Sequence, residues 1–323
     1  MKKLRKGAFL KPAMLLALAA VMAVLRPGMF LTPANLSSIL LAVCMYGVMA
    51  CGAIFPILNG GIDLSIGSVC ALSGSVMVLT TLAGGSTAAA TALGILLGLA
   101  AGTLCGLFNG LISCLFAVPA FIVTLAAKNI VLGITQNLTN QNTIICLHSG
   151  LLTWLGSGKV LGVPFPICFF LLTAAAAYFV LAHTRFGRYT YAVGGNPVAS
   201  GYSGVSAKGI CISAYALSGF AAALTGILLS CFNRQAVATQ GSSYDGDVLV
   251  ALVVGGVSMA GGEGTIQGML FGLLLMGMLS NAMVLLGVDA IYQDLIKGVI
   301  VIFAVAIDVY AKNKGNGLKK RHK

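Results

Sequence analysis

A lone carboxylate lies between two long apolar runs, in the segment N-G-G-I-D-L-S-I-G-S at residues 59–68. A charge at membrane depth is costly and is tolerated where irregular backbone lines a cavity or the protein interior. The segment therefore supplies candidates for a solute path or its gate: Asn59, Gly60, Gly61, Asp63 and Ser65. A second interpretation is purely structural, with Asp63, Ser65 and Ser68 capping the next helix by accepting its free N–H groups.

A second polar segment, residues 183–208, interrupts the apolar pattern and carries four basic side chains, His183, Arg185, Arg188 and Lys208. Within it, Asn196-Pro197 favours the start of a short helix. A helix at this position would provide a docking surface across the end of a helix bundle. The alternative is an ordinary basic loop whose charge only reflects the side of the membrane on which it lies.

A third segment combines two acids with repeated glycines: Y-D-G-D at 244–247, then V-G-G-V-S-M-A-G-G-E-G-T at 254–265. The glycines predict a hinge or a re-entrant break between two spans. G-G-I-D at 60–63 and G-G-V-S at 255–258 both follow apolar runs, in opposite halves of the chain. This correspondence is a faint sign of an internal repeat of the transporter kind, although double glycines are frequent in a chain with 42 glycines.

The chemistry of an enzyme is missing from the sequence. No phosphate-binding G-x-x-x-x-G-K-[ST] pattern occurs in the sequence. The nearest fragment, G-S-G-K-V at 156–160, lacks both the earlier glycine and the Ser or Thr. The chain has three His and seven acidic residues, and its nine cysteines form no C-x-x-C pair. We therefore expect no enzymatic activity, no metal and no cofactor, and any uphill transport must draw its energy from another subunit.

The composition identifies the elements that hold these segments. The chain has 323 residues, of which 59% are hydrophobic and 8% charged, with a mean hydropathy of +1.00. A typical soluble domain has roughly 25% charged residues. The apolar residues also fall in runs of the length that crosses a membrane core. The sequence thus predicts one all-α, polytopic integral membrane domain over residues 1–323.

Ten spans are predicted from the apolar runs, at residues 9–25, 39–58, 66–83, 88–116, 119–137, 163–182, 209–231, 246–260, 265–286 and 290–309. The net charge of +12 is concentrated in two basic tails, residues 1–11 and 311–323. Positive charge marks cytoplasmic segments, so an even number of spans places both tails and residues 183–208 in the cytoplasm. Residues 138–162 then lie outside, and the charge is explained without a nucleic-acid partner.

Glycines recur at every fourth position of two predicted spans. Small residues at this spacing let membrane helices approach closely, so we expect a compact bundle held by these positions. They are Gly94, Gly98, Gly102, Gly106 and Gly110 in the fourth span, and Gly264, Gly268 and Gly272 in the ninth.

Four segments in order resemble the permease subunits of bacterial ATP-binding-cassette importers for ribose, xylose, arabinose, galactose and related sugars. They are G-G-I-D-L-S-I-G-S (60–68), H-T-R-F-G-R-Y-T-Y-A-V-G-G-N (183–196), V-G-G-V-S-M-A-G-G-E-G-T (254–265) and L-L-G-V-D-A-I-Y-Q-D-L-I-K-G (285–298). The resemblance covers residues 30–310. It implies a bacterial cytoplasmic (inner) membrane protein without an ATPase site of its own, forming the path for a monosaccharide.

The resemblance also implies partners: a second permease copy or a sister permease, cytoplasmic ATPase subunits that use the ATP, and an external sugar-binding protein. It assigns the ATPase-coupling role to Arg185, Gly187, Arg188, Gly194, Gly195, Asn196 and Pro197. Many relatives carry acidic residues after the G-G-N, where this chain has Pro197, Val198 and Ala199. The coupling surface is therefore less charged, and the resemblance does not identify its ATPase partner.

Two other functions remain open from the sequence. The same system could carry a nucleoside or a small signalling sugar. A self-sufficient secondary transporter or channel would instead need coupling residues within the membrane, for which Asp63 and Lys297 are the candidates. Lys297 follows Asp294 by three residues, so a local ion pair on one helix would satisfy it structurally.

Overall fold

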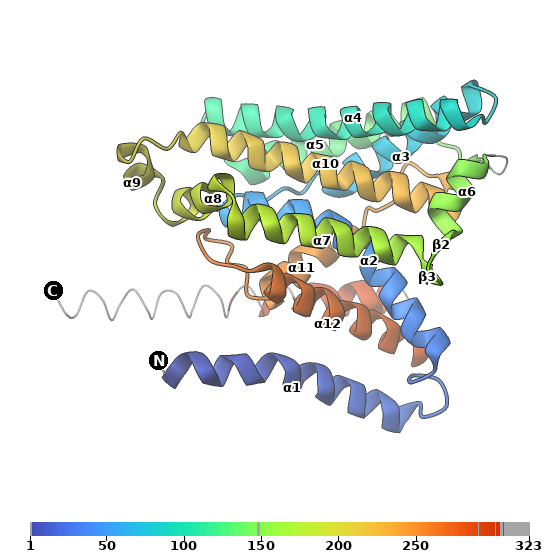
Figure 1. Ribbon diagram of the computed structural model, residues 1–323, viewed down its shortest axis with the longest axis horizontal. Helices are drawn as coiled ribbons and strands as arrows, with labels where there is room; N and C mark the ends of the chain where they lie inside the picture. The colour runs from blue at the N-terminus through green and yellow to red at the C-terminus, as the bar shows by residue number, and fades with distance from the viewer. Residues whose placement is uncertain (1, 147–148, 290, 301, 304–305, 307–323) are drawn as a thin grey trace.

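The computed structural model describes residues 2–146, 149–289, 291–300, 302–303 and 306. The structure is dominated by helices that run back and forth along one direction (Figure 1). They are α1 (Lys2–Leu25), α2 (Pro33–Leu58), α3 (Ile66–Ala83), α4 (Ala88–Leu115), α5 (Ala120–Leu138), α6 (Gly150–Ser157), α7 (Phe165–His183), α8 (Arg185–Gly195), α9 (Pro197–Tyr202), α10 (Ala207–Asn233), α11 (Tyr244–Val254) and α12 (Ile266–Leu285). Residues 291–300 are also helical.

Several long helices begin at a hydroxyl side chain that accepts a hydrogen bond from a free N–H of the first turn. Thr32, Thr87, Ser206 and Thr265 play this role at the starts of α2, α4, α10 and α12. A backbone N–H left unpaired in an apolar environment is costly, so such caps fix where each apolar run becomes helical.

Seven helices in the described residues are long and apolar enough to cross a membrane: α2, α3, α4, α5, α7, α10 and α12. Each overlaps one of the ten predicted spans. In the other three, the apolar helix Pro12–Leu25 is shorter, α11 has only 11 residues, and the last span lies partly outside the described residues. The basic tail 311–323 also lies outside them. A multi-pass membrane protein with seven clear spans follows.

The centre of the bundle is α10, which packs against α2, α3 and α4. The glycine ladder of α4 makes this close packing possible. A Cβ at Gly94 or Gly98 would lie within 2.7 Å of backbone oxygens of α3, and one at Gly106 would lie 2.2 Å from the Tyr215 carbonyl oxygen of α10. In α12, Gly268 and Gly272 contact Gly255 and Ala251 in the same way.

The two ends of the bundle differ. The start of α1 lies at the same end as α8 and α9, whereas α6 and the short strands lie at the opposite end (Figure 1). The strands are two residues each and form two antiparallel pairs: β1 (Ile144–Ile145) with β4 (Gln235–Ala236), and β2 (Lys159–Val160) with β3 (Val163–Pro164). They modify the all-α expectation only within loops.

Candidate functional site

The starts of α3 and α11 meet inside the bundle. Residues 59–65 are not helical and lead from the end of α2 into α3, and residues 237–243 lead from β4 into α11. A Cβ at Gly67 would lie 2.6 Å from the Gly241 carbonyl oxygen, and Gly241 has the left-handed φ of +81° that favours glycine. Two polar, non-helical segments therefore bring two helix N-termini together, as in transporters with interrupted helices.

Asp63 is buried at this junction, and its carboxylate accepts three hydrogen bonds. The donors are the backbone N–H of Ser65 at 3.0 Å, the Ser65 hydroxyl at 2.7 Å and the Ser218 hydroxyl of α10 at 2.8 Å. Asn109 of α4 donates to the Ser65 hydroxyl oxygen at 2.8 Å. Asp63 thus ties the non-helical segment to α10 and, through Ser65, to α4.

The capping interpretation of this segment needs correction. Ser65 occupies the position before the first turn of α3, but its side chain accepts no hydrogen bond from that turn. The Asp63 carboxylate binds Ser65 itself and a distant helix instead. Its role in the structure is therefore a tertiary contact rather than a local helix cap.

The other predicted path residues lie close to Asp63. A Cβ at Gly61 would lie 2.3 Å from the Tyr215 hydroxyl, and one at Gly60, which has φ of +80°, would lie 3.5 Å from the Ala260 carbonyl oxygen. The Asn59 amide is buried, and neither of its polar atoms has a hydrogen-bond partner among the described residues. The candidate segment therefore contacts α10 through Gly61 and Asp63, and residues 255–264 through Gly60.

Two ion pairs flank the start of α11, and sequence reasoning missed both. Lys128 of α5 pairs with Asp245, and Lys297 pairs with Asp247 at 2.9 Å. The expected partner of Lys297, Asp294, is replaced by an acid 50 positions away along the chain. The sequence did hold a signal for these pairs, namely a lone lysine in an apolar span and two acids in a short span. Buried charges must be paired, so such residues predict ion pairs between helices.

The predicted coupling segment forms two short helices, α8 and α9. The Thr184 hydroxyl accepts from the Gly187 N–H at 3.2 Å, and the Asn196 side-chain oxygen accepts from the Ala199 N–H at 3.0 Å. Pro197 occupies the first position of α9, as Asn196-Pro197 predicted. Five of the seven coupling candidates are exposed, namely Arg185, Arg188, Gly195, Asn196 and Pro197.

The remaining two coupling candidates are packing positions. A Cβ at Gly187 would lie 2.3 Å from the Leu181 carbonyl oxygen, and one at Gly194 would lie 1.8 Å from the Leu58 carbonyl oxygen. That same Leu58 oxygen accepts a hydrogen bond from the Gly262 N–H at 2.8 Å. Gly194, Leu58 and Gly262 therefore form a three-way backbone contact, which we term the glycine joint.

Two side chains of α8 reinforce the glycine joint. The Tyr191 hydroxyl donates to the Gly264 carbonyl oxygen at 2.8 Å, and the rings of Phe186 and Phe55 lie 5.8 Å apart. Burial raises the pKa of the Tyr191 hydroxyl, so it remains a neutral donor. Gly264 precedes α12 rather than belonging to it, and its φ of +156° needs glycine. The predicted coupling segment thus contacts residues from both halves of the chain.

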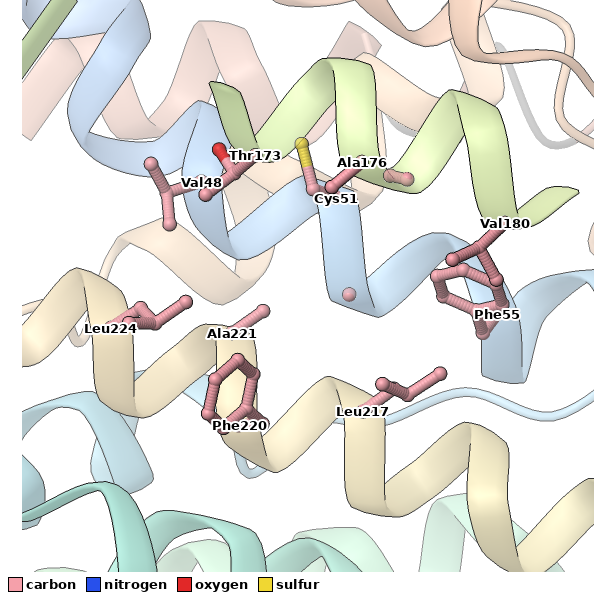
Figure 2. A pocket seen from close by; sticks show the side chains of 12 residues that line it. Val48, Cys51, Phe55, Thr173, Ala176, Val180, Leu217, Phe220, Ala221 and Leu224 are labelled. Atoms are coloured by element: carbon pink, nitrogen blue, oxygen red, sulfur yellow. The ribbon is translucent and has the colours of Figure 1, made fainter. Parts of the chain in front are cut away.

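A separate cavity lies between α2, α7 and α10 (Figure 2). Its lining is apolar apart from Thr173, whose hydroxyl already donates to the Phe170 carbonyl oxygen at 2.9 Å. Its volume of about 140 Å³ is below the range of roughly 300–1,000 Å³ that is usual for ligand pockets. This cavity does not have the polar groups that a sugar would need.

Comparison with known proteins places the chain in a family. A family model described as "Branched-chain amino acid transport system / permease component" matches residues 35–305. The ribose import permease RbsC of Escherichia coli K12 is 39% identical over 301 residues, with 91% of each chain covered. The RbsC of Bacillus subtilis 168 is also 39% identical, over 91% of this chain and 90% of its own.

A permease for another sugar is also similar to this chain. The L-arabinose ABC transporter permease AraH of Azospirillum brasilense is 34% identical over 292 residues, covering 90% of this chain and 84% of its own. No solved structure matches the chain. The motifs, the multi-pass helical architecture and these relatives agree, and the chain therefore belongs to the permease components of ATP-binding-cassette sugar importers.

Proposed function

We propose that this permease forms the membrane path for a monosaccharide, which an extracytoplasmic binding protein delivers and a separate cytoplasmic ATPase drives. The observation that carries the proposal is the exposed pair α8–α9, held on the bundle by the glycine joint. Its exposed surface combines two arginines with apolar and aromatic side chains, including Tyr202 at 90% exposure. Arg and Tyr are enriched where proteins dock, and α8–α9 is the surface that we assign to the ATPase.

The mechanism that we propose is alternating access. ATP binding closes the ATPase pair and displaces α8–α9, so that the path between two permeases opens to the outside. The binding protein then releases its sugar, and hydrolysis restores the inward-open state. In this scheme both basic tails and α8–α9 lie in the cytoplasm, at one end of the ten-span bundle in the bacterial inner membrane.

The ion-driven alternative is less well supported by the contacts of its two candidate residues. Asp63 accepts three hydrogen bonds and Lys297 is paired with Asp247, so each group is already satisfied within the bundle. A coupling ion would have to displace these partners. Transport of a nucleoside or a small signalling sugar remains a second candidate, because external delivery determines which solute reaches the permease.

Two experiments test the proposal. Gentle purification of the tagged chain from its native membrane, followed by mass spectrometry, is expected to recover a P-loop ATPase and a sugar-binding protein. Reconstituted vesicles with these partners should take up the sugar only when ATP is supplied. Solute uptake by the permease alone, driven by an ion gradient without ATP, would contradict the proposal and turn attention to Asp63 and Lys297.

A further inference from the structure

One face of α5 carries polar side chains that the bundle does not cover. Asn129, Gly133 and Asn137 follow at four-residue intervals, which places them on one face, and all three are exposed. Beyond the helix, Asn140 and Gln141 are exposed as well. Four of these five, together with Gln136, line one shallow recess: Gly133, Gln136, Asn137, Asn140 and Gln141. We term these six residues, Asn129 included, the amide face.

The polar surface continues from α5 onto the start of α11. The ion pair of Lys128 with Asp245 joins the two helices next to Asn129. At the start of α11, Ser242, Ser243 and Gly246 are exposed, while Asp245 is buried. Polar groups thus extend from the end of α5 to the junction inside the bundle.

Helix α5 also exposes large apolar side chains, including Ile130 and Ile134, so the polar residues form only a part of its outer surface. The outer surfaces of other spanning helices carry no comparable row of exposed amides in the part of the chain that the structure describes. The large exposed side chains of α4 are apolar, including Leu93, Leu96 and Leu104, and those of α7 include Leu171 and Leu172. Such surfaces suit lipid, whereas exposed amides and an open helix start do not, because lipid offers them no hydrogen-bond partners. The amide face therefore requires water, solute or a polar partner surface.

We propose that the amide face and the exposed start of α11 form one wall of the solute path, and that a neutral, hydroxyl-rich solute passes along it. The proposal rests on the proposed function, since the facing wall is supplied by the second permease of the pair. Amide and hydroxyl groups both donate and accept hydrogen bonds, as sugar hydroxyls do. The two lysines beside this wall are paired with Asp245 and Asp247, so neither lysine presents an unpaired positive charge to the solute.

Cysteine accessibility tests the wall directly in the assembled transporter. Gly133 suits the test because a Cβ there meets nothing within 4 Å. Leu93 is the matched control: it is 53% exposed and lies five residues from the start of α4, as Gly133 lies five from the end of α5. Gly133→Cys should react with a charged, water-soluble methanethiosulfonate at least about tenfold faster than Leu93→Cys, because a thiolate forms only in water. The unmodified chain provides the blank for the native cysteines.

A bulky substitution provides the functional readout. Gly133→Trp is expected to reduce ATP-dependent sugar uptake, with ATPase co-purification unchanged, whereas Leu93→Trp should transport normally. Equal labelling of the two cysteines with normal uptake by Gly133→Trp would overturn the wall and leave the proposed function intact. If Gly133→Cys does not react but forms a disulfide with a second copy, Gly133 lies in a contact between permeases that excludes water. That result would also overturn the proposed wall. Absence of ATP-dependent uptake by the unmodified transporter would overturn the proposed function, and the wall with it.

Discussion

Gly194 at the glycine joint gives the sharpest test of how the coupling helices are held. A Cβ at Gly194 would lie well inside van der Waals distance of the Leu58 carbonyl oxygen, and 2.6 Å from the Gly262 nitrogen. Both atoms belong to the backbone, so neither can rotate away. The next residue is a matched control, because a Cβ at Gly195 meets nothing within 4 Å. Gly194→Ala and Gly195→Ala thus add the same methyl group to adjacent positions.

The expected cost of Gly194→Ala follows from these contacts. Forcing a methyl group into a packed site costs about 1–3 kcal/mol. Displacing Leu58 from Gly262 also breaks their 2.8 Å hydrogen bond, and a buried group left unpaired costs about 1–3 kcal/mol. The free energy of unfolding should therefore fall by about 2–6 kcal/mol for Gly194→Ala. Gly195→Ala should change it by less than about 0.5 kcal/mol.

Thermal unfolding of the purified variants in detergent, followed by the fluorescence of a fused reporter on size-exclusion chromatography, provides the assay. Gly194→Ala is expected to unfold at a clearly lower temperature than the unmodified protein, and Gly195→Ala at the same temperature. If both variants unfold together with the unmodified protein, α8 is not seated on Leu58 and Gly262, and the reasoning about the glycine joint is wrong.

Three further predictions concern coupling, the junction and the ion pairs. Gly195→Trp should leave membrane insertion intact but reduce ATP-dependent uptake, because its exposed position lies on the proposed ATPase-docking surface; normal uptake would exclude that role. Asp63→Asn should lower uptake more than it lowers the amount of protein in the membrane, measured by immunoblot, whereas equal losses would indicate a purely structural residue. Lys297→Ala should reduce stability by about 3–5 kcal/mol, because it leaves the Asp247 carboxylate buried and unpaired. The double variant with Asp247→Ala should recover part of this loss in thermal unfolding; no recovery would refute the pairing.

The long spans were predictable because a helix that faces lipid needs an apolar run of fixed length. Every one of the seven clear spans coincides with such a run, and α3 begins at the predicted residue Ile66. The span predicted at 246–260 was less accurate, since α11 ends at Val254. Gly256 follows with φ of +88°, which breaks the helix while the composition stays apolar. Hydropathy does not distinguish an apolar helix from apolar irregular backbone.

The ion-pair partners of the charged residues could not be predicted from spacing along a single helix. Spacing suggested Asp294 for Lys297, because residues three apart on a helix are neighbours. The structure brings Asp247 to the same lysine, across 50 positions. The amide face shows the same limit: Asn129 and Asn137 are visible in the sequence, but whether they face the bundle or its surroundings depends on how α5 packs against α3 and α4.

The glycine joint also connects the proposed docking surface with the junction inside the bundle. Leu58 is the last residue of α2 and leads into residues 59–65, which carry Asp63 and start α3. Gly262 lies between α11 and α12. A displacement of α8 therefore acts on the backbone that precedes α3 and on the backbone that follows α11. These are the two helices whose N-termini meet inside the bundle, so the contacts that hold α8 in place also connect it, through the backbone, with the proposed path.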